Sequence, residues 1–248
     1  MSRKHLGKVV KSYSSASFKT LDPIPRNLNR DSFGMDFWNA FEFTYLDKNN
    51  LPVLRVLEIS IPSDSKNIVE SKSLKIYLNS FYNKQYSHKE DVLNIIKKDL
   101  DKITKASINI RFINKFSKAP QSLNLNTTKL NKTPSQRVLL FTGFRSICPV
   151  TAQPDFANIY IYTDEKIDIS WLNNFLVSYK DKGDFHEQCI EAIFLEIKNK
   201  YNPKKLDIIG RFMRRGGIDI NPIRATHSFL IPDFFTNPIY TISKTLRQ

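Results

Sequence analysis

The sequence predicts an α+β fold made of two tandem modules, each an antiparallel sheet with two helices packed on one face. Two strands, two helices and further strands are expected in each half of the chain, and this order is typical of the α+β class. The halves also align at a constant offset of 98 positions (for example 186 − 88). Such self-similarity indicates a repeated unit. The aligned pairs are Leu74 with Leu172, Tyr77 with Phe175, Ser80 with Ser178, His88 with His186, and Ile96 with Phe194.

The first half begins with a predicted hairpin. Apolar and polar residues partly alternate over residues 38–45 and again over residues 54–61, with a turn-rich tetrad at 47–50 between them. Two helices follow, because apolar residues recur at helical spacing from Leu74 to Phe81 and Ser87 with Glu90 forms a capping box. A further strand is expected at residues 108–112.

The second half repeats this plan after residues 117–135, a polar, asparagine-rich stretch that we interpret as a linker. The expected elements are strands at 137–141 and 157–162, a helix from Ser170, a helix opened by a capping box of Asp184 with Glu187, and strands at 206–212 and near Phe229. The predicted organisation is therefore a basic N-terminal tail (1–33), a first module (34–116), the linker, and a second module (136–248).

Composition narrows the class of protein. Hydrophobic residues make up 41% of the 248 residues, enough for a core, and no segment approaches the roughly 20 apolar residues of a membrane span. The N-terminal stretch has no apolar run typical of a secretory signal. With only two cysteines in the chain, we expect a reducing, cytoplasmic setting and no membrane partner.

The net charge of +14 raises the possibility of nucleic-acid binding. The lysines are nevertheless spread along the chain, and their densest groups fall at predicted helix ends, where cations complement the helix dipole. We therefore expect no direct nucleic-acid partner. A basic RNA-binding module without catalysis remains an alternative, which salt-dependent RNA binding would support.

The most informative stretch is residues 147–156, which carries Cys148 and Asp155 seven positions apart. Pro149 and Pro154 favour a rigid loop, and the loop lies between two predicted strands. Cys148 is a candidate nucleophile and Asp155 a candidate proton donor. The alternative from spacing alone is a buried structural cysteine and a turn aspartate.

The run Cys-Pro-Val-Thr-Ala-Gln-Pro-Asp at 148–155 resembles the active-site segment of NADPH-dependent 7-cyano-7-deazaguanine reductases, the nitrile reductases of queuosine biosynthesis. Residues 70–77, 185–189 and 214–222 resemble three further motifs of that family, in the same order. The resemblance runs from about residue 34 to 226 and indicates the long, two-module form. The chain departs from the family pattern at Phe144, at Arg145, and at Phe156, where tryptophan is expected.

The resemblance implies a fold, a reaction and an assembly. The fold is the tunnelling fold, whose modules join edge to edge into barrels with ligand sites between them. The reaction reduces a nitrile to an amine with two NADPH through a covalent thioimide on Cys148, with Asp155 as the acid. This reaction is a step in a tRNA modification. A small-molecule partner and a homo-oligomer, preferably a homodimer, follow from the same resemblance.

The resemblance also assigns binding residues. The substrate would contact Val69, Glu70, Ser71, His186 and Glu187, since a carboxylate accepts two hydrogen bonds from the donor edge of a deazapurine. The cofactor would contact Ser71, Lys72, Arg215 and Gly216, because the chain has no Gly-x-Gly-x-x-Gly motif and helix starts and glycine turns bind phosphates. No metal is expected.

Other interpretations of these residues stay open. Glu187 fits the third position of a capping box, and Glu70 fits a first-turn acid facing the helix dipole. A zinc-dependent purine or pterin cyclohydrolase on the same scaffold would need a cluster of cysteine and histidine ligands, and the chain has two cysteines and four histidines. Cys189 is either a thiol that forms a reversible disulfide with Cys148 or part of an apolar helix stripe.

Overall fold

The computed structural model describes residues 17–26, 32–114 and 119–227. The chain forms two compact units. The first comprises Met1–Asn29, Trp38–Lys115 and Arg215–Ile218, and the second comprises Arg30–Phe37, Phe116–Arg214 and Asp219–Gln248. Most of the predicted N-terminal tail and the strand expected near Phe229 lie outside the described residues.

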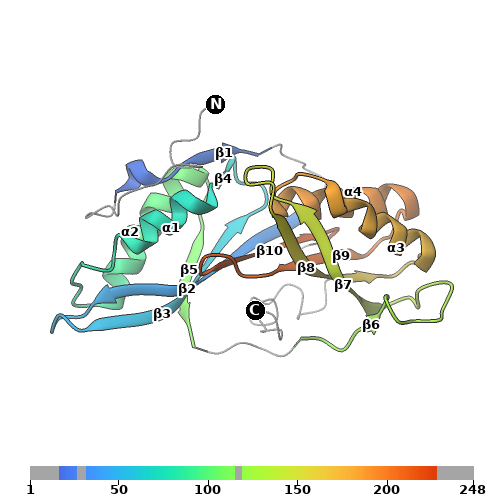
Figure 1. Cartoon of the computed structure of the whole chain (residues 1–248), viewed down its shortest axis with the longest axis horizontal. Helices are drawn as coiled ribbons and strands as arrows, with labels where there is room; N and C mark the ends of the chain where they lie inside the picture. Colours follow the sequence, from blue (N-terminus) through green and yellow to red (C-terminus); the bar gives the residue numbers. More distant parts are fainter. Residues whose placement is uncertain (1–16, 27–31, 115–118, 228–248) are drawn as a thin grey trace. The chain divides into compact units, whose positions relative to one another are not determined.

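The first unit pairs small sheets with two helices (Figure 1). Its strands lie in the orders β1-β4 and β5-β3-β2. The first five residues of β2 belong to the second unit. Its core is aromatic, with Phe81 packed against Phe43 and Tyr77. The elements are η1 (Phe18–Thr20), β1 (Pro23–Pro25), β2 (Phe33–Leu46), β3 (Pro52–Pro62), β4 (Asn67–Val69), α1 (Ser71–Asn79), α2 (Lys89–Thr104) and β5 (Asn109–Ile113).

The second unit contains strands in the order β10-β9-β8-β7-β6, with helices α3 and α4 on one face (Figure 1). Neighbouring strands pair antiparallel from β7 to β10, and β6 pairs parallel with β7. The elements are β6 (Leu123–Asn124), β7 (Arg137–Ile147), β8 (Pro154–Thr163), α3 (Ile169–Val177), η2 (Ser178–Asp181), α4 (His186–Tyr201), β9 (Leu206–Phe212) and β10 (Ile218–Ala225).

Strand β9 shows why this sheet is buried on both faces. Successive strand side chains point to opposite faces. Leu206, Ile208 and Phe212 belong to the core shared with α3 and α4, whereas Ile209 belongs to a second cluster on the other face. All seven residues of β9 are buried.

The helices repeat at nearly the predicted offset. Helices α1 and α3 each have nine residues and begin 98 positions apart (169 − 71), and each has a serine as its C-cap, Ser80 or Ser178. Helices α2 and α4 each have 16 residues and begin 97 positions apart (186 − 89). The predicted α+β class is confirmed.

Both predicted capping boxes are wrong. Helix α2 begins at Lys89, and its N-cap His88 makes no side-chain cap hydrogen bond. Helix α4 begins at His186, with Phe185 as N-cap, and Gln188 Oε1 accepts a hydrogen bond from Phe185 N at 3.1 Å. Because each helix begins one residue later than the sequence pattern indicated, the glutamates do not fall at the third position.

The predicted strands that fall within the described residues are present, and four of them are longer than expected. Residues 38–45 and 54–61 lie inside β2 and β3, and residues 137–141 and 157–162 lie inside β7 and β8. The stretch interpreted as a linker contains the short strand β6. Within the described ranges, no helix has the length and apolar character needed to cross a membrane.

Candidate active site

Cys148 lies at the turn of the β7–β8 hairpin in the second unit. Its amide donates to Gln153 O at 2.9 Å, and its carbonyl accepts from Ala152 N at 3.0 Å. Ala152 has a φ of 54°, so the turn includes a left-handed residue. The thiol is free and partly exposed. The predicted loop between two strands is therefore confirmed, and it carries the Cys148 side chain, whose role as a nucleophile stays a prediction.

Asp155 is the second residue of β8 rather than part of the loop, which corrects the predicted extent of the loop. It pairs with Ser146 across the hairpin, and it is buried although it carries a carboxyl group.

His186 joins Asp155 and α4. Its Nε2 atom lies 3.2 Å from Asp155 Oδ2, so the carboxyl and the imidazole are within hydrogen-bond reach. Its ring stacks on Phe212 of β9, with 3.8 Å between ring centroids and 7° between planes. Its Nδ1 atom is buried and has no hydrogen-bond partner among the described residues. The imidazole is therefore held at one face and at one nitrogen.

Glu187 is the second residue of α4 and is 3% exposed. Gln188, not Glu187, closes the helix start, so capping does not explain why this carboxylate is buried. Burial of a carboxylate is costly unless a partner satisfies it. The observed helix start thus removes the capping interpretation of Glu187.

The sequence analysis missed two residues of β9 that locate the start of α4. One is Phe212, whose ring supports His186. The other is Gly210: a Cβ atom built there would lie 2.6 Å from Ile190 Cδ1, so any larger residue would require the Ile190 side chain of α4 to shift. An isolated glycine inside a strand pattern is the signal that could have identified this contact.

A buried ion pair also fixes α4 to the sheet. Arg224 of β10 is fully buried, donates to Asp36 Oδ1 at 2.8 Å and pairs with Glu191 of α4. Ser32 Oγ donates to the other oxygen of Glu191 at 2.9 Å. The two carboxylates raise the pKa of Arg224 despite its burial, so it stays charged. Breaking such a pair is strongly destabilising.

Cys189 lies in the core beneath α4 and is fully buried. Burial raises the pKa of its thiol to about 12, although the Ser146 hydroxyl beside it acts in the opposite direction. Ser146 of β7 is two residues before Cys148. The contact between Ser146 and Cys189 therefore places Cys189 near the base of the hairpin. The thiol is free in this structure.

The remaining substrate candidates lie in the first unit. Val69 ends β4, and Glu70 is the N-cap of α1. The carboxylate of Glu70 accepts hydrogen bonds from Lys72 N at 2.9 Å and Ser73 N at 2.7 Å, so it caps the helix rather than merely facing its dipole. Each carboxylate oxygen has a second acceptor site. Glu70 can therefore cap α1 and bind a ligand through the same two atoms.

All four cofactor candidates also lie in the first unit. Ser71 and Lys72 begin α1, and Arg215 and Gly216 belong to the turn that precedes β10. Arg215 and Ile218 exchange backbone hydrogen bonds across Gly216 and Gly217, whose φ values are 56° and 79°. Positive φ at both central positions is the geometry of a type I′ turn, which glycine suits best.

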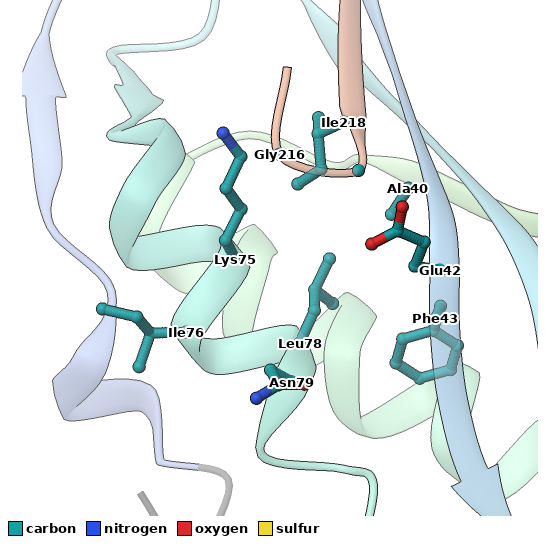
Figure 2. Close-up of a pocket in the computed structure, with 10 residues that line it drawn as sticks. Ala40, Glu42, Phe43, Lys75, Ile76, Leu78, Asn79, Gly216 and Ile218 are labelled. Carbon is teal, nitrogen blue, oxygen red and sulfur yellow. The ribbon is translucent and has the colours of Figure 1, made fainter. Parts of the chain in front are cut away.

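A cavity of about 290 Å³ lies beside this turn (Figure 2). Its walls come from β2, α1 and the turn, and all of its lining residues belong to the first unit. Lys75 and Glu42 are its charged side chains. Among the described residues, no three His, Cys, Asp or Glu side chains gather as metal ligands.

Comparisons with known proteins identify the family of this chain. A family model described as "Nitrile reductase, 7-cyano-7-deazaguanine-reductase N-term" matches residues 11–112, and one described as "QueF-like protein" matches residues 154–229. The crystal structure of the archaeosine synthase QueF-Like in the apo form aligns with 38% of this chain and 94% of its own, at 18% identity and a TM-score of 0.35.

Three curated relatives are each described as an NADPH-dependent 7-cyano-7-deazaguanine reductase. The protein from Buchnera aphidicola subsp. Schizaphis graminum is 35% identical, over 86% of this chain and 94% of its own. The protein from Burkholderia vietnamiensis is 34% identical, over 92% and 95%. The protein from Desulfotalea psychrophila is 34% identical, over 90% and 92%. With this identity over nearly the whole length, the chain belongs to the family of NADPH-dependent 7-cyano-7-deazaguanine reductases.

Proposed function

We propose that this protein reduces the nitrile of 7-cyano-7-deazaguanine to the aminomethyl group of 7-aminomethyl-7-deazaguanine, a step of queuosine biosynthesis. The observation that supports this best is Cys148 on a hairpin whose next strand carries Asp155 buried against His186. A nucleophile with an adjacent acid is what addition to a nitrile needs. The identity of the substrate and of the cofactor is inferred from membership of the reductase family.

Each side chain has a defined step. The Cys148 thiolate forms a bond to the nitrile carbon while Asp155 gives its proton to the nitrile nitrogen, which yields a thioimide. Ser71, Lys72, Arg215 and Gly216 would hold NADPH, which would supply one hydride for the thioimide carbon and, from a second molecule, one for the imine carbon. Cys148 leaves as thiolate between the two reductions. His186 holds Asp155 in place, and a second proton, taken from solvent, completes the amine nitrogen.

Other residues orient the two ligands. Glu187 and Glu70 accept hydrogen bonds from the donor edge of the deazapurine, with Val69, Ser71 and His186 beside it. Ser71, Lys72, Arg215 and Gly216 hold the cofactor phosphates. The helix start at Ser71 and the cation next to two flexible glycines support this assignment.

The finer architecture belongs to the same proposal. The chain is two tandem tunnelling-fold modules, at residues 34–116 and 136–248, with residues 1–33 as a basic tail and residues 117–135 as the linker. The repeated pair of nine- and 16-residue helices supports two copies of one module. We propose a cytoplasmic homodimer that binds a small molecule and makes no direct contact with nucleic acid.

The test is incubation of the full chain with 7-cyano-7-deazaguanine and NADPH while the absorbance of the reduced cofactor is followed. We expect two NADPH to be oxidised for each aminomethyl product formed. Absence of nitrile-dependent NADPH oxidation would contradict the proposal. Lys72→Ala and Arg215→Ala should each raise the KM for NADPH about tenfold or more, with little change in the KM for the nitrile.

A further inference from the structure

The end of the β7–β8 hairpin that carries Cys148 extends past the pairing of β8 with β9. The register of those two strands ends at Ala157 and Phe212. One further hydrogen bond, from Met213 N to Phe156 O at 2.9 Å, lies just beyond it. The position of Cys148 therefore depends on contacts other than the ladder between β8 and β9.

Residues 180–183, which connect η2 to the start of α4, lie along the edge of β7 at this end of the hairpin. Ile147 N donates to Lys182 O at 2.8 Å, and Ile147 forms a parallel bridge with Gly183. A Cβ atom built at Gly183 would lie 3.8 Å from Pro149 Cα, which is ordinary contact distance. The segment therefore supports both the last residue of β7 and the turn that follows it.

Arg145 adds a side-chain contact between β7 and the same segment. Its Nη1 atom donates to Lys180 O and, at 3.2 Å, to Asp181 Oδ1. Carbonyls at the end of a helix lack partners within the helix, and a guanidinium can serve a carbonyl and a carboxylate together. The Arg145 and Asp181 side chains are 35% and 75% exposed, so we expect this contact to fix position more than it stabilises the fold.

The segment that Arg145 binds leads directly into α4, which other contacts hold on the sheet. Glu191 of α4 pairs with the buried Arg224 of β10. Because α4 is fixed independently, a contact between β7 and residues 180–183 sets the place of the hairpin end relative to the first turn of α4. That turn contains His186, the partner of Asp155.

We propose that Arg145 is a positioning residue, which holds the Cys148 hairpin at a fixed distance from the first turn of α4. This inference rests on the proposed function, because it concerns the addition of Cys148 to the nitrile. Addition needs the Cys148 sulfur and the Asp155 carboxyl in place at the same moment, and small displacements of reacting groups lower rates strongly. Arg145 is a position at which the sequence departs from the family pattern, so the family motifs did not indicate this role.

The test compares Arg145→Met with the wild type, because methionine keeps an unbranched stem and removes the guanidinium. The rate of adduct formation on Cys148 is followed by intact mass at saturating 7-cyano-7-deazaguanine without NADPH. We expect Arg145→Met to lower this rate about tenfold or more. The Kd of the nitrile, measured by calorimetry on a Cys148→Ala background, should stay unchanged, because α4 and its Glu187 keep their place.

Two further variants separate position from charge. Arg145→Lys keeps the charge and can still reach one of the two acceptors, so it should recover part of the lost rate. Arg137→Met removes the same group from the exposed first residue of β7 and should alter neither the rate nor the Kd. The midpoint of denaturant unfolding should be the same for all of these proteins.

Amide hydrogen exchange gives a measurement that needs no nitrile. The amides of Ile147, Cys148 and Ala152 donate hydrogen bonds in the hairpin and to its support. Peptides that cover residues 147–153 should exchange about tenfold faster in Arg145→Met than in the wild type, because the hairpin end opens locally more often.

The inference is overturned if Arg145→Met forms the adduct as fast as the wild type, if its hairpin peptides exchange no faster, or if the nitrile Kd rises as much as the rate falls. Failure of the proposed function would appear in the wild type itself, which would form no adduct. Failure of this inference alone would appear as equal adduct rates and equal exchange in two proteins that both react with the nitrile.

Discussion

His186 Nε2 lies 3.2 Å from Asp155 Oδ2, and the same imidazole stacks on Phe212. His186 is the first residue of α4 and Asp155 is the second residue of β8. A third element, strand β9, supports this pair through Phe212. The pair brings an acid and a base into reach of each other beside the Cys148 hairpin. This geometry gives Asp155 a defined partner for a proton, which a turn aspartate would lack.

Asp155→Asn should bind the nitrile with little change but turn it over about a hundredfold more slowly, because the amide cannot supply the proton that addition requires. Titration calorimetry measures binding and the NADPH assay measures turnover. Phe212→Leu is the matched variant, since it keeps Asp155 but removes the ring under His186. A turnover number for Asp155→Asn close to that of the wild type would argue against the acid role.

Glu187→Gln should weaken nitrile binding about tenfold or more while the free energy of unfolding changes little. The physical reason is that Glu187 is buried at the second position of α4 and makes no cap. Gln188→Ala is the control, because Gln188 Oε1 accepts from Phe185 N. That variant should lower stability by about 1 kcal/mol and leave affinity unchanged. If the two variants show the reverse pattern, Glu187 is structural.

Because of Asp207, we expect the free energy of unfolding to fall as pH rises from about 4 to 8. Burial raises the pKa of this carboxyl group from 3.8 to about 8, against the opposing charge of Lys205. Its Oδ2 atom has no hydrogen-bond partner among the described residues. Between pH 4 and 8 the folded state therefore keeps a proton that the unfolded state releases. Stability then declines by up to about 1.4 kcal/mol per pH unit across that window.

Denaturant unfolding of the wild type and of Asp207→Asn at pH 5 and pH 7.5 measures this effect. The asparagine side chain does not titrate, so the variant should lose this part of the pH dependence and gain stability relative to the wild type at the higher pH. Equal differences between the two proteins at both pH values would mean that Asp207 does not titrate in this window.

Cys148 and Cys189 are predicted to form a reversible disulfide after oxidation of Cys148 by peroxide. The Cys189 thiolate attacks the sulfenic acid on Cys148 and water leaves. With a pKa of about 12, Cys189 is protonated near neutral pH, so the disulfide should form slowly there and faster as pH rises. Peptide mapping without reductant detects the linked pair, and dithiothreitol should restore activity.

Cys189→Ala should lose activity irreversibly under the same treatment. A variant that loses and regains activity like the wild type would assign Cys189 to the core alone, where it packs with Ile190 and Ile193.

The sequence predicts the helices and strands well because their patterns are local. Alternation predicted β2 and β3, strand-like runs predicted β7 and β8, and the 98-residue offset predicted that α1 corresponds to α3. The first residue of each helix was less predictable, because a shift of a single backbone hydrogen bond moves the helix start by one residue. Glu70 proves to be a cap and Glu187 does not, the reverse of the two capping interpretations. Phe212, Gly210 and Arg224 act through contacts between distant segments, which no local pattern reveals.

The most direct test of the central claim is the intact mass of the full chain after incubation with 7-cyano-7-deazaguanine in the absence of NADPH. A thioimide retains all atoms of both partners, so the wild type should gain the full mass of the nitrile, and Cys148→Ala should gain none. Addition of NADPH should then return the wild type to its original mass with release of the amine. An adduct of the same mass on Cys148→Ala, or none on the wild type, would contradict the account.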